Sequence, residues 1–209
     1  KQNIKIVEKN GIKIAFVSFN QYVNGVTYQK KLPYMINFHE STMMENMKKA
    51  RENADIVIVS CHWGIEYDYY PNTFQKNMAK QLADAGADVI IGTHPHTLQD
   101  VEYIQRADGK RTLVAYSLGN FVSGMLEESC QLEGMLSFDI EKKKIKNVVF
   151  TPLVNYYTLT GKRERHDFSV YRLKDYTNKL VEKHGFPNLT IPYMKEEVKQ
   201  KVKNIKIDM

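Results

Sequence analysis

Three histidines follow two apolar segments that have the character of buried strands. His62 comes directly after the apolar run at residues 56–61, and His94 and His96 come after the run at residues 88–93. Imidazole nitrogen is a common protein ligand for transition metals, and it suits Zn, Mn, Fe, Ni or Cu better than Mg or Ca. Three such ligands without a fourth leave a coordination position for water, whose pKa a divalent ion can lower to about 7. The residue types and their spacing therefore predict a metal site.

This pattern also has a plainer interpretation. A single histidine at a strand end is more often a hydrogen-bonded surface residue than a ligand, and a His-x-His pair is a weak motif on its own. Two histidine-bearing strand ends at one edge of a sheet favour the metal site over that alternative. The remaining histidines have no such context and are predicted to be surface residues: His39, His166 and His184.

Two neighbours of the histidine pair bear on how the rings are placed. Pro95 disfavours helical backbone at the residue before it, so we expect an extended segment in which His94 and His96 face the same side. Gly92 has no side chain, which predicts that another segment passes close to its backbone, as a crowded site requires.

The elements around the histidines predict a βαβ crossover. A strand at residues 55–60 is followed by a helix at 74–85 and a second strand at 88–91. Asn72 or Thr73 can cap the helix, and Gly86 supplies its stop. Strands joined in this way are parallel, so their carboxyl ends lie at the same edge of the sheet and bring the three histidines together. A further strand at 112–116 leads into Asn120, which we expect at the same rim.

The rest of the chain is less informative about chemistry. Asn10-Gly11 between two apolar runs predicts an N-terminal hairpin, followed by a long loop from Asn20 to His39. Thr42 and Glu45 have the spacing of a capping box, which predicts a helix to about Asn53. The later segments predict a hairpin at 134–150 that turns at residues 142–144, and helices at about 173–184 and 194–203.

Composition is that of one ordinary globular domain. The 209 residues are 43% hydrophobic and 26% charged, and no apolar run approaches the ~20 residues that cross a bilayer. The net charge of +6 is concentrated in lysines at 142–146, predicted to form a hairpin tip, and at 195–206, predicted to form a solvated helix face. A basic bias suits an anionic polymer or substrate, whereas nucleic acid is not expected because no basic stripe is interleaved with aromatics. Cys61 is predicted to be a small buried thiol.

An ordered series of motifs carries a resemblance to a known family. The chain resembles the bacterial capsule synthesis CapA family of poly-γ-glutamate synthesis proteins, within the calcineurin-like metallophosphoesterase superfamily, over about residues 4–155. The motifs are His-Trp-Gly-x-Glu-Tyr at 62–67, Pro71, Gln75, Ala-Gly-Ala-Asp-Val-Ile-Ile-Gly-x-His-Pro-His at 85–96, Gln99 and Tyr-Ser-Leu-Gly-Asn-Phe at 116–121.

The resemblance implies an α/β fold, the C-terminal half of a metallophosphoesterase-like β-sandwich flanked by helices, with about 155–209 as a family-variable extension of the single domain. It also implies a site for two divalent ions, Mn, Fe or Zn, in the intact protein. His62 and His94 would bind one ion and His96 the other. Glu66 and Asn120 match motif positions at the same rim, and Glu66 is expected either to contact substrate or to orient a ligand.

The family's earlier motifs have no counterpart in this sequence. They would supply a bridging carboxylate, the remaining ligands and the proton donor, so no catalytic acid is assigned and this chain alone is expected to be inactive. We expect a missing N-terminal part as a partner, with a homodimer as the alternative cover for an exposed sheet edge. The resemblance implies a place at the cell surface, anchored to the membrane through a segment absent from this chain.

Three functions remain open at this point. The first is a metal-dependent hydrolase acting on a phosphoester or anionic polymer in capsule biosynthesis. The second is a non-catalytic factor that binds or assembles the polymer at the same rim. The third is a hydrolase of another lineage with one ion held by the three histidines.

Overall fold

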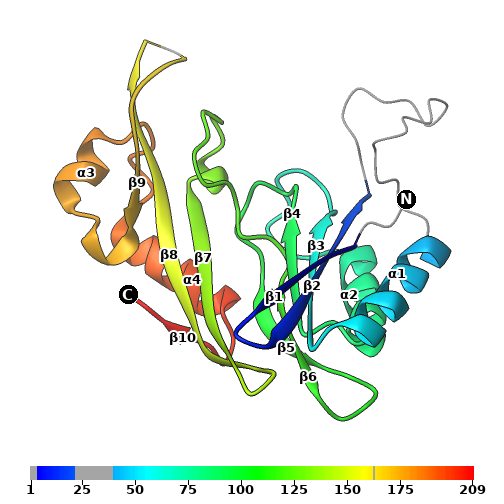
Figure 1. Ribbon diagram of the computed structural model, residues 1–209. Helices are drawn as coiled ribbons and strands as arrows, with labels where there is room; N and C mark the ends of the chain where they lie inside the picture. The colour runs from blue at the N-terminus through cyan, green and yellow to red at the C-terminus, as the bar shows by residue number, and fades with distance from the viewer. Residues whose placement is uncertain (1–3, 22–39, 162) are drawn as a thin grey trace, which may run out of the picture.

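The computed structural model describes residues 4–21, 40–161 and 163–209, and it has two β-sheets with helices packed against them. The predicted α/β fold is confirmed. The long loop predicted at 20–39 lies outside the described residues from position 22 onward, as does His39. Figure 1 shows the elements, which are β1 (Ile4–Lys9), β2 (Ile12–Asn20), α1 (Glu40–Asn53), β3 (Ile56–His62), α2 (Thr73–Asp84), β4 (Val89–Thr93), β5 (Val101–Gln105), β6 (Arg111–Ala115), the 3-10 helix η1 (Glu128–Cys130), β7 (Leu132–Glu141), β8 (Lys144–Thr160), β9 (Glu164–Arg172), the 3-10 helix η2 (Leu173–Asp175), α3 (Asn178–Lys183), α4 (Ile191–Lys201) and β10 (Lys206–Ile207).

The first sheet positions the histidines. Its strand order is β1-β2-β3-β4-β6-β5, and β2, β3, β4 and β6 are parallel while β1 and β5 are antiparallel to their neighbours. The predicted crossover is confirmed, because β3 pairs directly with β4 and His62 lies opposite Thr93. The carboxyl ends of β3, β4 and β6 consequently meet at one edge of the sheet.

Local signals placed several boundaries correctly. Asn10 and Gly11 both have positive φ, at 52° and 71°, as a two-residue hairpin turn requires, and β1 pairs with β2 around them. Asn72 caps α2 in a capping box with Gln75, and Gly86 follows the helix at a φ of 101°.

Helices α1 and α2 cover one face of the first sheet (Figure 1). Alternate residues of the strands point toward them and form a buried cluster with methionine and leucine side chains of the helices. Representative members are Val17, Val59, Ile90, Met47 and Leu82. Helix α1 begins at Glu40, so the capping box predicted at Thr42 is wrong, although the predicted end at Asn53 is confirmed.

The second sheet contains β10, β8 and β7 in that order, with β9 also paired to β8. The predicted hairpin at its centre is confirmed, with Lys142 and Lys143 at positive φ in the turn. A second buried cluster joins this sheet to the first, because Val101 and Ala115 pack with Phe150, Val154 and helix α4. Strand β7 ends the order of this sheet as far as the structure describes the chain.

The region after residue 155 departs most from expectation. Strand β9 was not predicted, and the helix expected at 173–184 is divided into η2 and α3. Earlier in the chain, strand β5 of the first sheet was also not predicted. His184 is only 5% exposed and not a surface residue, whereas His166 is exposed as predicted. A ring cluster that includes Tyr156 and Tyr176 encloses His184, and burial lowers its pKa to about 4.

Within the described ranges, no helix combines the length and apolar character that a membrane crossing requires.

Candidate metal centre

The three predicted histidines lie together at the carboxyl edge of the first sheet. His62 is the last residue of β3, and His94 and His96 follow the end of β4. The ring centroids of His62 and His94 are 4.4 Å apart, and those of His94 and His96 are 6.0 Å apart. The parallel pairing of β3 and β4 is therefore sufficient to gather residues that are 32 or more positions apart in sequence.

The backbone at the histidine pair is not extended, which corrects the expectation drawn from Pro95. His94 has a φ of 102° and His96 a φ of 64°, both in the region that side chains other than glycine rarely adopt. Such residues cost on the order of 1–3 kcal/mol each and persist where the surrounding structure determines them. The turn brings both rings toward one place, but by a strained path that a preference before proline does not reveal.

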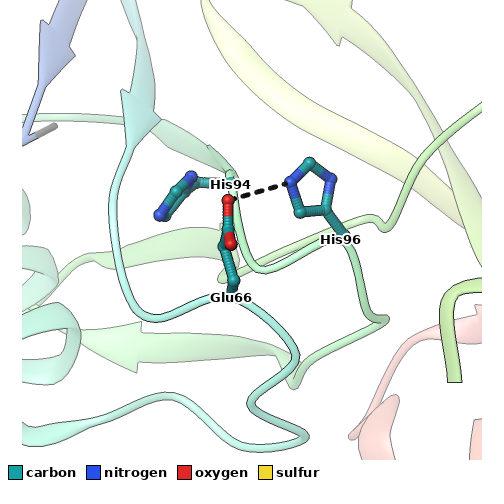
Figure 2. A group of neighbouring side chains, drawn as sticks. All are labelled: Glu66, His94 and His96. Carbon is teal, nitrogen blue, oxygen red and sulfur yellow. Dashed lines mark ion pairs between the residues drawn. The ribbon is translucent and has the colours of Figure 1, made fainter. Parts of the chain in front are cut away.

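Glu66 completes a group of three potential ligands with the histidine pair. One ligand atom from each of Glu66, His94 and His96 lies within 4.8 Å of the others, and Glu66 Oε1 is 3.8 Å from His96 Nε2. Figure 2 shows the carboxylate between the two rings. Ligand atoms of a tetrahedral zinc ion lie about 3.4 Å apart, so a small closure of side chains gives the required geometry.

The donor chemistry of this group fits a divalent transition metal. Two imidazoles and one carboxylate are a ligand set that catalytic zinc sites use. Burial, followed by the neighbouring His62, lowers the pKa of His94, which favours the neutral imidazole that binds a metal. His62 stands beside His94 and is not in the group of three. The set of His62, His94 and His96 as ligands stays a prediction, and Glu66 is the residue to which sequence reasoning gave no ligand role.

Asn120 orients His96. Its Oδ1 lies 2.9 Å from His96 Nδ1, and its amide nitrogen lies 3.4 Å from the carbonyl oxygen of the same histidine. With Oδ1 accepting, Nδ1 carries the proton and Nε2, which faces Glu66, keeps its lone pair for a metal. The motif position that had no assigned role therefore has a physical one.

We expect Asn120→Ala to weaken zinc binding by about 10- to 100-fold, because the imidazole loses the contact that fixes its tautomer and direction. Isothermal titration of the chain with Zn²⁺ measures the change. Asn188→Ala, at an exposed position after α3, is the matched control and should leave the affinity unchanged. Equal affinities for Asn120→Ala and the unmodified chain would rule out this role.

A buried layer beneath the histidines explains two more motif positions. Trp63 is 2% exposed, and its indole N–H donates to the carbonyl oxygen of Tyr116 at 2.9 Å. The indole crosses over Gly92, where an added Cβ would lie 1.9 Å from the Tyr116 oxygen and 2.3 Å from the indole nitrogen. The close approach predicted at Gly92 is confirmed. This layer fixes β3, β4 and β6 relative to one another directly below the site.

The loop at residues 65–70, called here the Glu66 loop, is held by its backbone. The backbone N–H of Tyr67 donates to the carbonyl oxygen of Pro95. The Gln99 side chain donates to the carbonyl oxygens of Asp68 and Tyr70, and the Thr97 hydroxyl also donates to the carbonyl oxygen of Asp68. Gln75 in turn donates to the Gln99 side chain at 2.8 Å. The glutamines of the motif series therefore connect the start of α2 to the loop that carries Glu66.

Comparison with known families places this geometry in context. The family model described as bacterial capsule synthesis protein PGA_cap matches residues 1–125. A capsule biosynthesis protein CapA of Bacillus anthracis is 37% identical over 126 residues, and a PGA biosynthesis protein CapA of Bacillus subtilis (strain 168) is 32% identical over 154 residues. These alignments cover 58% and 73% of this chain, but the chain spans only 29% and 39% of those relatives.

Two solved structures resemble the fold distantly, each at 14% sequence identity. The NAD nucleotidase of Haemophilus influenzae has a TM-score of 0.41, over 99% of this chain and 38% of that one. A phosphatase of Mycoplasma pneumoniae has a TM-score of 0.43, over 82% of this chain and 57% of that one. Similarity at this level does not assign an activity.

Proposed function

The chain belongs to the family of bacterial capsule synthesis proteins, and from that membership we propose that it forms the metal-binding edge of a metal-dependent hydrolase in capsule biosynthesis. The observation that carries the proposal is the convergence of Glu66, His94 and His96, whose ligand atoms lie within 4.8 Å of one another. The proposed substrate is a phosphoester or an anionic polymer such as poly-γ-glutamate.

Each residue has a defined part in this proposal. Glu66, His94 and His96 hold a divalent ion, Mn, Fe or Zn, and Asn120 directs His96 toward it. When bound, such an ion acts as a Lewis acid on a phosphoryl or carbonyl oxygen and lowers the pKa of water. His62, beside His94, is proposed to serve a second ion in the intact protein.

The remaining parts of the machinery are proposed to lie elsewhere in a longer protein. The chain spans well under half of the relatives it matches, so there is room for a bridging carboxylate, further ligands and a proton donor. We also propose that the intact protein works at the cell surface, where capsule polymer is assembled, and that its own N-terminal part packs against this chain.

We expect His94→Ala to abolish tight binding of Zn²⁺ or Mn²⁺, lowering the affinity by more than about 100-fold, because loss of a direct ligand should exceed loss of its supporting contact. Equilibrium dialysis with elemental analysis of the 209-residue chain gives the ions bound per molecule. His166→Ala is the matched control, since His166 is exposed on β9. Absence of bound metal in the unmodified chain would refute the proposed centre. Hydrolysis of a generic phosphodiester by the intact protein, lost in the same variant, tests the catalytic part.

A non-catalytic polymer-binding factor is the second candidate, and the net charge of +6 favours it because a basic protein attracts an anionic polymer at long range. The two proposals differ in their dependence on metal. Poly-γ-glutamate retention on immobilised protein that is equal with and without chelator, together with no hydrolysis, supports the binding factor and opposes the hydrolase.

A further inference from the structure

The Glu66 loop has an anchored backbone although its side chains are exposed. Ile65 is 53% exposed, Tyr69 45% and Tyr70 61%, so little apolar burial holds these residues in place. Where a surface loop buries so little, its conformation depends on the partners of its backbone groups. The position of Glu66 therefore depends on the donors that reach the loop's carbonyl oxygens.

One of those donors comes from the other end of the chain. Lys201 is the last residue of α4, and its ammonium group donates to the carbonyl oxygen of Tyr69 at 2.6 Å across 132 positions of sequence. The same ammonium group lies 4.4 Å from the ring centroid of Tyr70 and 5.6 Å from that of Tyr69. A hydrogen bond and two cation–π contacts converge on adjacent residues of one loop.

The burial of Lys201 is unusual for its residue type. The side chain is only 2% exposed, although lysines are almost never fully buried unless paired. Burial lowers its pKa, which reflects the free energy needed to remove an ammonium group from water. The lysines at 195–206 were predicted to form a solvated face, and Lys201 is the exception that points inward to the site loop.

We propose that Lys201 is a positioning residue of the metal centre, which holds the Glu66 loop so that the Glu66 carboxylate stays beside His94 and His96. The inference rests on the proposed metal centre and extends it. Lys201 lies outside residues 1–125, to which the family model matches, so a ligand inside the matched region depends on a side chain beyond it. Helix α4 thereby supports the metal centre as well as packing in the second buried cluster.

The test is a double-mutant cycle on zinc affinity, measured by isothermal titration of the 209-residue chain. Lys201→Met keeps a long apolar side chain but removes the donor and the charge, and we expect it to lower the affinity about tenfold. In a Glu66→Ala background the same substitution should have no further effect, because the ligand that it positions is already absent. Lys199→Met, exposed on the same helix, is the matched control and should behave as the unmodified chain in both backgrounds.

Two outcomes overturn the inference. The first is an unchanged zinc affinity in Lys201→Met, and the second is an equal loss of affinity with and without Glu66, which would indicate general destabilisation of the fold. Circular dichroism melts accompany each titration, and Lys201→Gln carries the same test if the methionine variant is unfolded. If the unmodified chain binds no zinc, the metal centre itself fails, whereas failure of Lys201 alone leaves His94→Ala with its full effect.

Discussion

Gly92→Ala is expected to lower the free energy of unfolding by about 3 kcal/mol or more. The new Cβ would lie 1.9 Å from the Tyr116 carbonyl oxygen and 2.3 Å from the Trp63 indole nitrogen, and the first of these is a backbone atom of the residue that directly follows β6. Relief requires β4 to move away from β6 or the indole to lose its hydrogen bond to Tyr116. Urea denaturation followed by circular dichroism measures the loss.

The matched control separates steric overlap from the loss of a glycine. Gly109 lies in the turn between β5 and β6 at a φ of 81°, and an added Cβ there meets no atom within 4 Å. Gly109→Ala should cost only about 1–2 kcal/mol, from the positive φ alone. Equal losses of stability in the two variants would mean that steric overlap of the added Cβ at Gly92 contributes nothing, which would contradict this prediction.

Glu133→Gln is expected to stabilise the protein by about 4 kcal/mol at pH 7.5. Glu133 is fully buried at the start of β7, and neither carboxylate oxygen has a hydrogen-bond partner among the described residues. Burial raises its pKa to about 10, so the folded protein keeps this carboxyl group protonated. Glutamine has nearly the same shape and no proton to lose.

The direction of the pH dependence follows from that raised pKa. Between about pH 4.5 and pH 10 the folded chain retains a proton that the unfolded chain has released, so the contribution of Glu133 to stability falls as the pH rises. Each pH unit in this window costs about 1.4 kcal/mol. In Glu133→Gln this decline should be absent, as shown by urea unfolding at pH 5.5, 6.5 and 7.5.

Glu141→Gln provides the comparison at the exposed end of the same strand. Its effect should stay within about 0.5 kcal/mol at each pH, because an exposed surface substitution changes little. A Glu133→Gln variant with the stability and pH profile of the unmodified chain would mean that this carboxyl group has a partner or access to water in solution.

Sequence reasoning succeeded where a short segment determines its own structure. Asn10-Gly11 is suited to positive φ at both positions, and Asn72 was one of the two caps predicted for α2, so the hairpin turn and the start of that helix were readable. The capping box predicted at Thr42 was wrong, because α1 begins at Glu40. The gathering of His62 with His94 followed from one topological rule, that strands joined by a crossover helix are parallel. These features need only local sequence and general geometry.

The predictions were wrong where the structure depends on contacts between residues far apart in the sequence, which the local sequence does not indicate. His94 adopts positive φ against the preference set by Pro95, because the folded site determines its backbone. Lys201 has the same sequence context as the exposed lysines near it, yet it reaches a carbonyl 132 positions away. His184 gave no apolar signal of its own, and its burial depends on aromatic rings from β8 and from the segments after β9. A motif position such as Glu66 shows that a residue matters, whereas only coordinates show which atoms it faces.

The left-handed backbone at His94 and His96 also affects the entropy that is lost when an ion binds. Folding has already selected the unfavourable torsions, so the rings need not search for their directions when an ion arrives. The entropy that a relaxed loop would lose on coordination is lost earlier, during formation of the sheet and its supporting hydrogen bonds. The strained turn lowers the free energy of unfolding and in exchange raises the affinity for the ion. A chain with a relaxed turn would therefore be more stable to unfolding but would bind ions less tightly.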